Sequence, residues 1–348
     1  MTIIVTGGAG FIGSNFIQAY AKKIDEKIIN LDKLTYAGNL ENLISLKNNK
    51  NYEFIKGDIA NEDLVSNLFR KFKPKAMINF AAESHVDRSI KDPKSFISTN
   101  VFGTFNLLNC SMNYFEKLSI EEKEKFRFLH ISTDEVYGSL NPEDKPFKES
   151  NQYKPNSPYS ASKASSDHLV RSYFHTFKLP VLTTNCSNNY GPFQFPEKLI
   201  PLTITNALNF KKLPIYGNGL QIRDWLYVED HCNAIIKVLI DGKIGEVYNI
   251  GGNNEKTNIV VVKEICKILD KLKPISSDSK IKHYSDLIEF IDDRPGHDKR
   301  YAIDSNKIKK HLNWGPRETF ETGILKTVKW YLDNPEWIEN IISGDYLK

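Results

Sequence analysis

The sequence predicts an α/β fold built on a parallel sheet that is covered by helices on both faces. Short runs rich in β-branched and apolar residues alternate with longer amphipathic stretches through the first half of the chain. This alternation is typical of βαβ units, whose crossover helices cover both faces of a parallel sheet. The first apolar run also leads directly into a glycine-rich turn and then into a helical pattern.

The expected strands cover residues 2–6, 27–32, 52–58, 76–82, 126–132 and 180–186, and helical patterns lie near 12–23, 61–72, 93–115 and 157–177. After residue 187 the alternation breaks down because Pro, Asn and Gly interrupt the chain. Two later segments, 225–230 and 246–252, still read as strands that rejoin the sheet. We therefore expect a first domain over residues 1–187, with returning segments about 225–252, and a smaller, interwoven domain formed mainly by 188–348.

Composition excludes several classes of protein. The 348 residues are 40% hydrophobic and 26% charged with a net charge of +4, and the lysines are scattered, so we expect no nucleic-acid partner. No apolar stretch approaches the ~20 residues that span a bilayer, and the start of the chain resembles a strand and not a leader. The four cysteines (Cys110, Cys186, Cys232, Cys266) are far apart and lack histidines at metal-ligand spacing. We expect a soluble, cytoplasmic protein with no metal site and no membrane contact.

The segment TGGAGFIGS (6–14) places Gly7, Gly10 and Gly13 between the first strand and the first helix. Glycines here allow a tight turn, a close backbone approach to a pyrophosphate, and close helix packing. Asp32 ends the second strand, where a carboxylate accepts hydrogen bonds from a ribose 2′-hydroxyl. We expect a dinucleotide site that prefers NAD to NADP, although the positive charge of Lys33 weakens that preference.

Further candidates follow other strands of the same sheet. Asp58 and Ile59 follow the third strand, and Ala81, Ala82 and Ser84 follow the fourth. Ligands of open α/β sheets bind at the carboxyl ends of the strands. We expect an adenine ring near the first pair, and small alanines allow a cofactor to approach the backbone at the second.

Tyr159 and Lys163 lie four residues apart in a helical segment and therefore share one face. A free tyrosine is a poor base at neutral pH because its pKa is about 10. A neighbouring ammonium group, together with a positively charged nicotinamide, favours the phenolate and makes it a usable base. The alternative is an ordinary surface pair.

Asp134 and Glu135 follow the fifth strand in the run ISTDEVYG (131–138). Carboxylates are rarely buried, so a pair at the end of a central strand is either a cap with a loop charge or part of a reaction site. The sequence alone leaves both interpretations open.

These motifs together resemble the extended short-chain dehydrogenase/reductase family, through T-G-G-x-G-F-I-G, Ser132 with Thr133, and Y-x-x-x-K. The resemblance implies a seven-stranded Rossmann domain, bound NAD, and a smaller domain that holds a nucleotide-sugar. It also implies that Thr133 contacts the hydroxyl group being oxidised and that Lys163 holds the nicotinamide ribose. The cofactor site that it implies adds Phe11, Ile12, Thr35, Thr99 and Asn189 to the residues named above.

Within this family, segments 32–43, 81–90, 185–202, 213–231 and 293–304 resemble the nucleotide-sugar 4,6-dehydratases, in particular those that act on dTDP-glucose. Such enzymes oxidise sugar C4, remove the C5 proton, expel the C6 hydroxyl group and return the hydride to C6. Two close carboxyl groups can divide the base and acid roles because like charges separate their pKa values. By resemblance Asp134 is the acid and Glu135 the base, whereas the residues themselves do not decide this. A UDP-, CDP- or GDP-linked substrate is the alternative.

The expected substrate residues come mainly from the second half of the chain. Arg223 and Arg294 suit phosphate oxygens, and Lys198 adds a charge. Pro214 and Tyr216 can flank the base, and the remaining candidates are Ser84, Thr133, Asn188, Leu199, Asn258 and His297. Arg223 could instead pair with Asp224 or Asp230.

The sequence allows two alternative functions, and the family resemblance suggests an assembly state. An epimerase is disfavoured because it expels no water, and a non-catalytic NAD-binding regulator needs no paired acids. The family suggests a homodimer formed by the helices near 93–115 and 157–177, whose apolar faces could equally be core.

Overall fold

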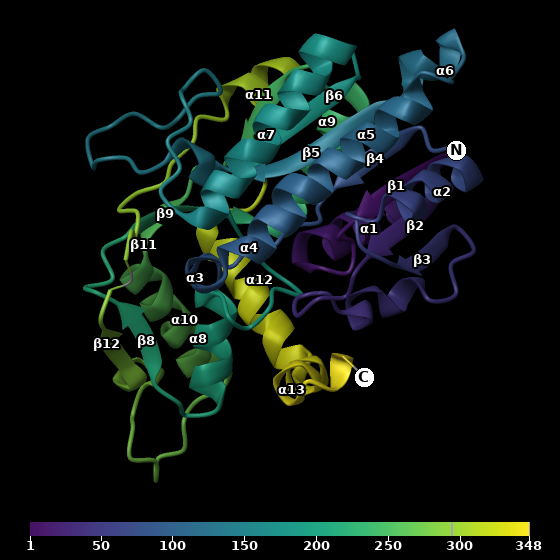
Figure 1. The fold of residues 1–348 in the computed structure, drawn as a ribbon. Helices are drawn as coiled ribbons and strands as arrows, with labels where there is room; N and C mark the ends of the chain where they lie inside the picture. Colours follow the sequence, from purple (N-terminus) through teal and green to yellow (C-terminus); the bar gives the residue numbers. More distant parts are fainter. Residues whose placement is uncertain (294, 348) are drawn as a thin grey trace.

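In the computed structural model, residues 1–293 and 295–347 are described, and they form a seven-stranded parallel sheet with a second lobe beside it (Figure 1). The strand order is β10-β6-β5-β4-β1-β2-β3. The strands are β1 (Thr2–Thr6), β2 (Lys27–Asp32), β3 (Tyr52–Lys56), β4 (Ala76–Asn79), β5 (Arg127–Thr133), β6 (Val181–Cys186) and β10 (Val247–Ile250). The predicted Rossmann-type fold is confirmed, and the order reverses at β1 and β4, where such sheets bind ligands.

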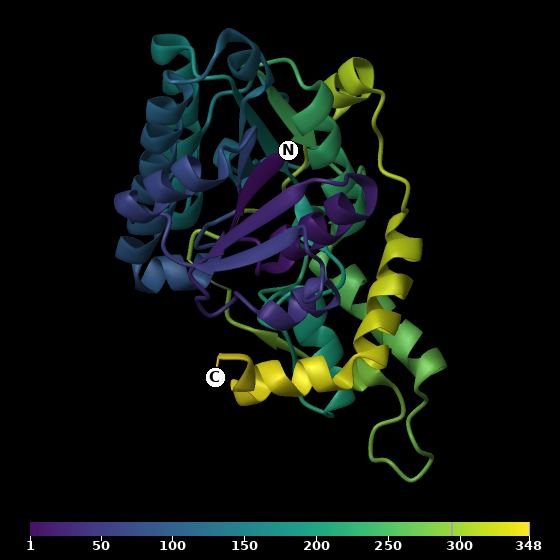
Figure 2. The same ribbon diagram turned by 90° about the vertical axis from the view of Figure 1, so that its right-hand side faces the viewer.

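Two helical layers enclose this sheet. One face carries α1 (Phe11–Lys23), α9 (Val228–Asp241) and α11 (Asn306–Leu312), and the other carries α2 (Glu62–Phe72), α5 (Thr104–Phe115) and α7 (Pro158–Phe177). Side chains alternate along each strand, so that Ile3 and Val5 pack in the first layer and Ile4 in the second. Figure 2 shows the two layers on opposite sides of the strands.

The predicted helix over 93–115 contains an irregular turn. It consists of α4 (Pro93–Phe96), a π-helix (Ile97–Gly103) and α5. Within the π-helix, the buried Asn100 side chain accepts a hydrogen bond from the Glu83 N–H (2.9 Å) and donates one to the Glu83 carbonyl (3.0 Å). Such π-turns are frequent near functional sites, and this one joins the helix to the loop after β4.

The second lobe contains two small sheets. β7 (Asn188–Tyr190), β9 (Ile222–Tyr227) and β11 (Glu255–Thr257) form one, and β8 (Leu213–Tyr216) and β12 (Ile288–Ile291) form the other. Its helices are α8 (Leu199–Leu208), α10 (Asn258–Leu272), α12 (Phe320–Asp333) and α13 (Pro335–Ser343). They enclose a separate core that includes Tyr190, Trp225 and Phe320.

One predicted strand joins the large sheet and the other does not. Segment 246–252 is confirmed, because β10 pairs with β6 in the seven-stranded sheet. The prediction that segment 225–230 forms a strand of that sheet is wrong. The strand there, β9, pairs with β7 and β11, because β10 occupies the place beside β6. The boundary between the two domains near residue 187 stays a prediction.

The remaining short elements are α3 (Val86–Lys91), α6 (Ile120–Lys125) and four 3-10 turns at Leu40–Leu46, Asp134–Tyr137, Tyr284–Leu287 and Asp345–Leu347. Among the described residues, none of the helices has both the length and the apolar character needed to cross a membrane.

Candidate active site

The glycine-rich turn has no room for side chains. Gly7 has a φ of +68°, and a Cβ atom there would lie 2.5 Å from the backbone nitrogen of Ala81. A Cβ atom on Gly13 would lie 2.3 Å from the carbonyl oxygen of Gly7. Gly10 is the N-cap of α1 and has no side chain, so the first N–H groups of the helix remain able to bind an anion. The turn therefore has the form of a pyrophosphate cradle.

Asp32 lies at the end of β2 beside this cradle and is only 8% exposed. Its Oδ2 atom accepts a hydrogen bond from the Ala9 N–H (2.9 Å) and its Oδ1 atom one from the Leu34 N–H (2.8 Å). Burial raises the pKa of Asp32, and these two hydrogen bonds oppose the shift. Because each carboxylate oxygen has two lone pairs, the group can still accept hydrogen bonds from ribose hydroxyls.

Lys33 is paired with Asp58 through a 2.7 Å contact between Nζ and Oδ2. Burial raises the pKa of Asp58, but hydrogen bonds from Lys33 and the Ala60 N–H outweigh this effect and lower it overall. The ammonium group of Lys33 is thus directed at Asp58 in the structure.

A single cleft of about 310 Å³ runs along the carboxyl ends of the central strands. Every residue expected at the cofactor lines it: Gly7, Gly10, Phe11, Ile12, Gly13, Asp32, Lys33, Thr35, Asp58, Ile59, Ala81, Ala82, Ser84, Thr99, Tyr159, Lys163 and Asn189. Thr133, Asp134, Glu135, Asn188 and Lys198 line the same cleft. The expected cofactor residues and the candidate reacting groups therefore lie in one continuous site.

Tyr159 and Lys163 lie in the first turns of α7, which a capping box at Ser157 begins. Both side chains are buried, and the Lys163 Nζ atom donates a 2.7 Å hydrogen bond to the Ile131 carbonyl. Burial raises the pKa of Tyr159 well above its usual value, and the neighbouring acidic groups of Glu135, Cys186 and Asp134 raise it further. A hydrogen bond with Thr133 lowers it.

The expectation that the Lys163 ammonium group and a bound nicotinamide together favour the phenolate stays a prediction. The Lys163 ammonium group donates to the Ile131 carbonyl on β5, whereas burial and nearby acidic groups raise the pKa of Tyr159. The tyrosine thus holds its proton in the chain alone, and positive charge brought into the cleft would act against this shift.

The two adjacent acids have different surroundings. Thr133 is the N-cap of the turn Asp134–Tyr137: its hydroxyl accepts a hydrogen bond from the Glu135 N–H and donates one to Asp134 Oδ1, both at 3.3 Å. The interpretation of Asp134 as a cap is therefore wrong. Asp134 is 2% exposed and, among the described atoms, its Oδ2 has no hydrogen-bond partner. Glu135 is partly exposed.

Burial raises the pKa of Asp134 well above 3.8, and the charges of Glu135 and Asp224 raise it further, against the opposing effect of Arg223. Asp134 is thus held in its protonated form in a site where Glu135 is more accessible to solvent. This difference matches a proton donor beside a separate base.

Arg223 on β9 belongs to the second lobe, is 5% exposed and lies outside the set that lines the cleft, although its charge acts on Asp134. Its guanidinium group donates to the carbonyls of Ile222 (2.8 Å) and Asp298 (3.0 Å) and lies 4.4 Å from the ring centroid of Tyr301. Of the two aspartates considered as alternative partners, Asp224 accepts hydrogen bonds from the N–H groups of Gly252 and Asn254, and Asp230 from those of Arg317 and Glu318.

Lys198 lies across the cleft mouth and donates to the Ser84 carbonyl (3.2 Å). The other expected substrate residues lie outside the set that lines the cleft. Tyr216 on β8 donates to Asp87 (3.3 Å) and packs edge-on against His297, with ring centroids 6.0 Å apart. Pro214 also lies on β8, Leu199 begins α8 and Asn258 begins α10. Arg294 lies outside the described residues.

Several lining residues were not predicted, among them Tyr36, Glu83, Cys186, Gln194 and Glu197. They come from loops and strand ends that approach the cleft from distant parts of the chain. Cys186 alone had a detectable signal, because it ends a predicted strand at the same edge as Thr133.

Comparisons with known proteins agree with this geometry. The family model described as GDP-mannose 4,6 dehydratase matches residues 4–327. A dTDP-glucose 4,6-dehydratase of Neisseria meningitidis is 54% identical, over 99% of this chain and 97% of its own.

Two solved structures are similar over almost their whole length. The dTDP-glucose 4,6-dehydratase of Bacillus anthracis, in complex with NAD, is 48% identical with a TM-score of 0.86, covering 98% of this chain and 99% of that one. The dTDP-glucose 4,6-dehydratase of Streptomyces venezuelae, with NAD and dTDP bound, is 42% identical with a TM-score of 0.88, covering 98% and 100%.

Proposed function

Because the chain belongs to the nucleotide-sugar 4,6-dehydratase family of extended short-chain dehydrogenases/reductases, we propose that it converts dTDP-glucose to dTDP-4-dehydro-6-deoxyglucose. The observation that carries this proposal is the pair Asp134 and Glu135 in one cleft with Tyr159 and Lys163. Oxidation of one carbon needs only the tyrosine and lysine, whereas elimination of water also needs a proton donor and a base.

NAD is the cofactor that fits the cleft, and when bound it accepts a hydride from sugar C4 and returns it to C6. The fit rests on the turn at Gly7 and Gly13, where side chains are excluded, and on Asp32, whose oxygens keep acceptor capacity for a ribose. The pairing of Lys33 with Asp58 removes the lysine as a partner for a 2′-phosphate.

Tyr159 is the base for the C4 hydroxyl proton, and Thr133 orients that hydroxyl. Thr133 hydrogen-bonds both the Glu135 N–H and Asp134, so its hydroxyl is fixed at the centre of the site. Lys163 holds the nicotinamide ribose and supplies positive charge near the tyrosine. General-base catalysis of this kind contributes roughly 10²–10⁴-fold to a rate.

Asp134 is the acid that protonates the departing C6 hydroxyl, and Glu135 is the base that removes the C5 proton. Burial and neighbouring carboxylates raise the pKa of Asp134 and so favour its protonated form. The more exposed Glu135 can return its proton to solvent after each cycle. The different burial of two adjacent carboxyls supports this division of roles.

The nucleoside diphosphate extends from the cleft toward the second lobe. Arg223 and Lys198 supply positive charge on that side, and Ser84 and Asn188 supply polar groups at the cleft wall. Leu199, Pro214, Tyr216, Asn258, His297 and Arg294 remain proposed contacts for the outer part of the substrate, with the base between Pro214 and Tyr216.

We also propose that two copies of the chain associate through the helix that contains the π-turn and through α7. Ile97, Phe102 and Phe105 are 52%, 63% and 41% exposed, and Phe177 at the end of α7 is 48% exposed. Large apolar side chains gathered on neighbouring helices favour association with an identical face. Light scattering should give twice the chain mass, and Phe102→Asp should give a single chain mass. A monomeric wild-type protein would contradict this assembly.

The four cysteines are free and buried, which fits a reducing compartment, and we propose that the protein acts in the cytoplasm.

The direct test incubates the purified protein with dTDP-glucose and, separately, with UDP-glucose. The absorbance that alkali reveals in a 4-keto-6-deoxy sugar reports the product. We expect it with dTDP-glucose and much less with UDP-glucose. Equal rates with both would refute the nucleobase preference, and no product from either would refute the dehydratase assignment.

A further inference from the structure

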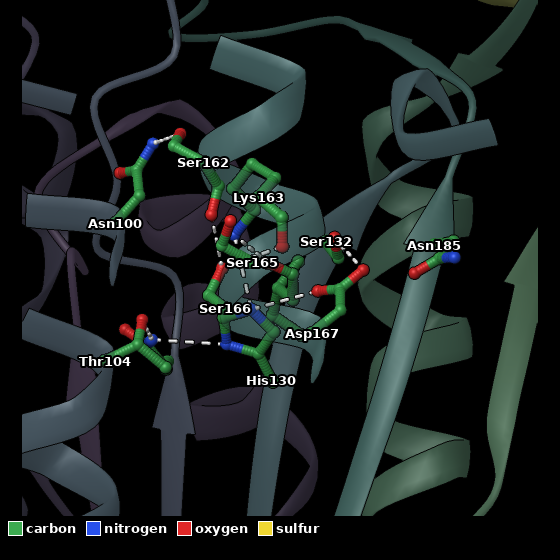
Figure 3. Close-up of polar contacts among 12 residues, drawn as sticks. Asn100, Thr104, His130, Ser132, Ser162, Lys163, Ser165, Ser166, Asp167 and Asn185 are labelled. Carbon is green, nitrogen blue, oxygen red and sulfur yellow. Dashed lines mark hydrogen bonds and ion pairs between the residues drawn. The ribbon is translucent and has the colours of Figure 1, made fainter. Parts of the chain in front are cut away.

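A buried polar cluster lies directly beneath the floor of the cleft, between β5 and α7 (Figure 3). We call it the His130 cluster and define it as His130, Ser132, Lys163 and Asp167. His130 is fully buried, and the other three side chains are at most 5% exposed. None of the reaction steps above uses His130 or Asp167.

The cluster is connected by short contacts. His130 Nε2 lies 3.5 Å from Lys163 Nζ and 3.3 Å from Asp167 Oδ1. The Ser132 hydroxyl donates to Asp167 Oδ2 (2.9 Å). On the other side of the ring, the Asn79 amide nitrogen lies 3.3 Å from His130 Nδ1. The lysine and the carboxylate therefore meet at Nε2, and the Asn79 amide group fixes the other nitrogen of the ring.

Helical spacing places three of the residues one after another along α7, starting at the cleft. Tyr159, Lys163 and Asp167 are successive i, i+4 positions of α7 and share one face. Tyr159 lines the cleft, and Asp167 lies two turns further along the helix, away from the cofactor turn. A buried carboxylate is costly unless a positive charge or hydrogen bonds compensate it, and the same holds for the buried ammonium.

Among the charged groups of the cluster, the Asp167 carboxylate acts on the Lys163 ammonium group. Burial and the charge of Lys163 lower the pKa of His130 to about 4, so the ring is neutral at physiological pH. Burial lowers the pKa of Lys163, and the charges of Asp167 and Cys186 oppose that shift. Since the Cys186 thiol has a pKa raised by burial and stays neutral, Asp167 is the carboxylate that compensates the lysine.

We propose that Asp167 is a positioning residue for the C4 oxidation: its carboxylate, in contact with His130 Nε2 beside the ammonium group, keeps Lys163 charged where it donates to the Ile131 carbonyl. This inference rests on the proposed function, because Lys163 acts there together with Tyr159. Asp167 is not among the residues that line the cleft, and in this proposal it works only through the lysine.

The expected effect on the pH profile follows from the groups around the pair. Tyr159 faces the carboxyl groups of Glu135 and Asp134 and the Cys186 thiol, all of which disfavour the phenolate. In the proposed reaction, the positive charge of Lys163 acts against them. If Lys163 loses its proton more easily, the tyrosine needs a higher pH to ionise. Removal of the Asp167 charge should therefore move the acidic limb of the rate profile to higher pH and the alkaline limb to lower pH.

The test is Asp167→Asn, which keeps the shape and removes the charge. In the holoenzyme, single-turnover reduction of the nicotinamide by dTDP-glucose is measured across a pH series. We expect the single-turnover rate at neutral pH to fall, because less of the tyrosine is ionised there. We expect the acidic limb to move to higher pH, and KM to change little because the substrate site is untouched. Asp241→Asn removes an exposed carboxylate of α9 that pairs with Lys237, and should leave the profile unchanged.

A second measurement needs no substrate. The Nζ resonance of Lys163 in ¹⁵N-lysine-labelled holoenzyme, identified by its loss in Lys163→Arg, reports the charge of the lysine against pH. In Asp167→Asn the Lys163 side chain should lose its charge at lower pH than in the wild type. An unchanged titration with an unchanged rate profile would overturn the proposal.

If Asp167→Asn does not fold, Ser132→Ala decides the matter, because it keeps the carboxylate but removes the hydroxyl that orients it. A shift of the Lys163 titration in the same direction supports the proposal, and no shift overturns it. Failure of the proposed function is distinguishable, since the wild type would then not convert dTDP-glucose while the lysine titration would still report on Asp167.

Discussion

Replacement of Asp134 by asparagine should make the protein more stable and less active at once. The carboxyl group is 2% exposed, and burial and neighbouring carboxylates raise its pKa well above 3.8. In the unfolded chain the same group ionises near its ordinary value. Between these two pKa values the folded wild type retains a proton that the unfolded chain releases, so the free energy of unfolding falls as pH rises.

The magnitude of this effect follows from the linkage relation. Each pH unit in that window lowers the free energy of unfolding of the wild type by about 1.4 kcal/mol, a slope that Asp134→Asn does not have at this site. Over two pH units, the difference in the free energy of unfolding between wild type and Asp134→Asn should grow by about 3 kcal/mol. The contribution of Asp134 to the free energy of unfolding is fully present below the pKa that the group has in the unfolded chain. It is lost as the pH rises through the pKa of the group in the folded protein.

Denaturant unfolding of both proteins at a series of pH values measures the difference directly. Turnover of the variant should fall roughly 10²–10⁴-fold through loss of the proton donor. Reduced nicotinamide should accumulate, because C4 oxidation does not need this acid. Parallel stability curves for the two proteins would refute the raised pKa, and normal turnover would refute the acid role.

Other substitutions test the remaining parts of the site. Glu135→Gln should leave folding and NAD binding intact but stop solvent exchange at sugar C5, and normal exchange would rule out the base role. Tyr159→Phe should abolish the near-ultraviolet absorbance of reduced nicotinamide in a single turnover, with dTDP-glucose binding retained as the control. Gly7→Ala should destabilise the protein by about 1–3 kcal/mol and remove bound NAD, because the new Cβ atom would lie 2.5 Å from the next strand's backbone at a positive φ; a variant purified with full NAD content would contradict the cradle.

Local patterns were sufficient for the large sheet. The six strands expected in the first half all appear, and their residues match β1 to β6 closely, because a buried parallel strand needs a continuous apolar run. The segment 225–230 shows the limit of this reasoning. It has the same apolar character, but the place beside β6 is taken by β10, and a neighbour far along the chain decides such a competition.

The site shows the same division between local and distant information. The spacing of Tyr159 and Lys163 predicted a shared helix face, and the glycine pattern predicted the cradle. The direction of the Tyr159 pKa was not predictable, because it depends on Glu135 and Cys186, which reach the tyrosine from two other elements. The sequence also could not assign the acid and base roles to Asp134 and Glu135, because the two residues differ in their burial.

The central claim is that one cleft carries out both oxidation and elimination. dTDP-glucose with deuterium at C4 tests it most directly, through analysis of the product. The arrangement of Tyr159, Asp134 and Glu135 predicts a 4-keto-6-deoxy sugar with the deuterium at C6. Deuterium back at C4 in an epimerised sugar, or lost to solvent, would contradict it.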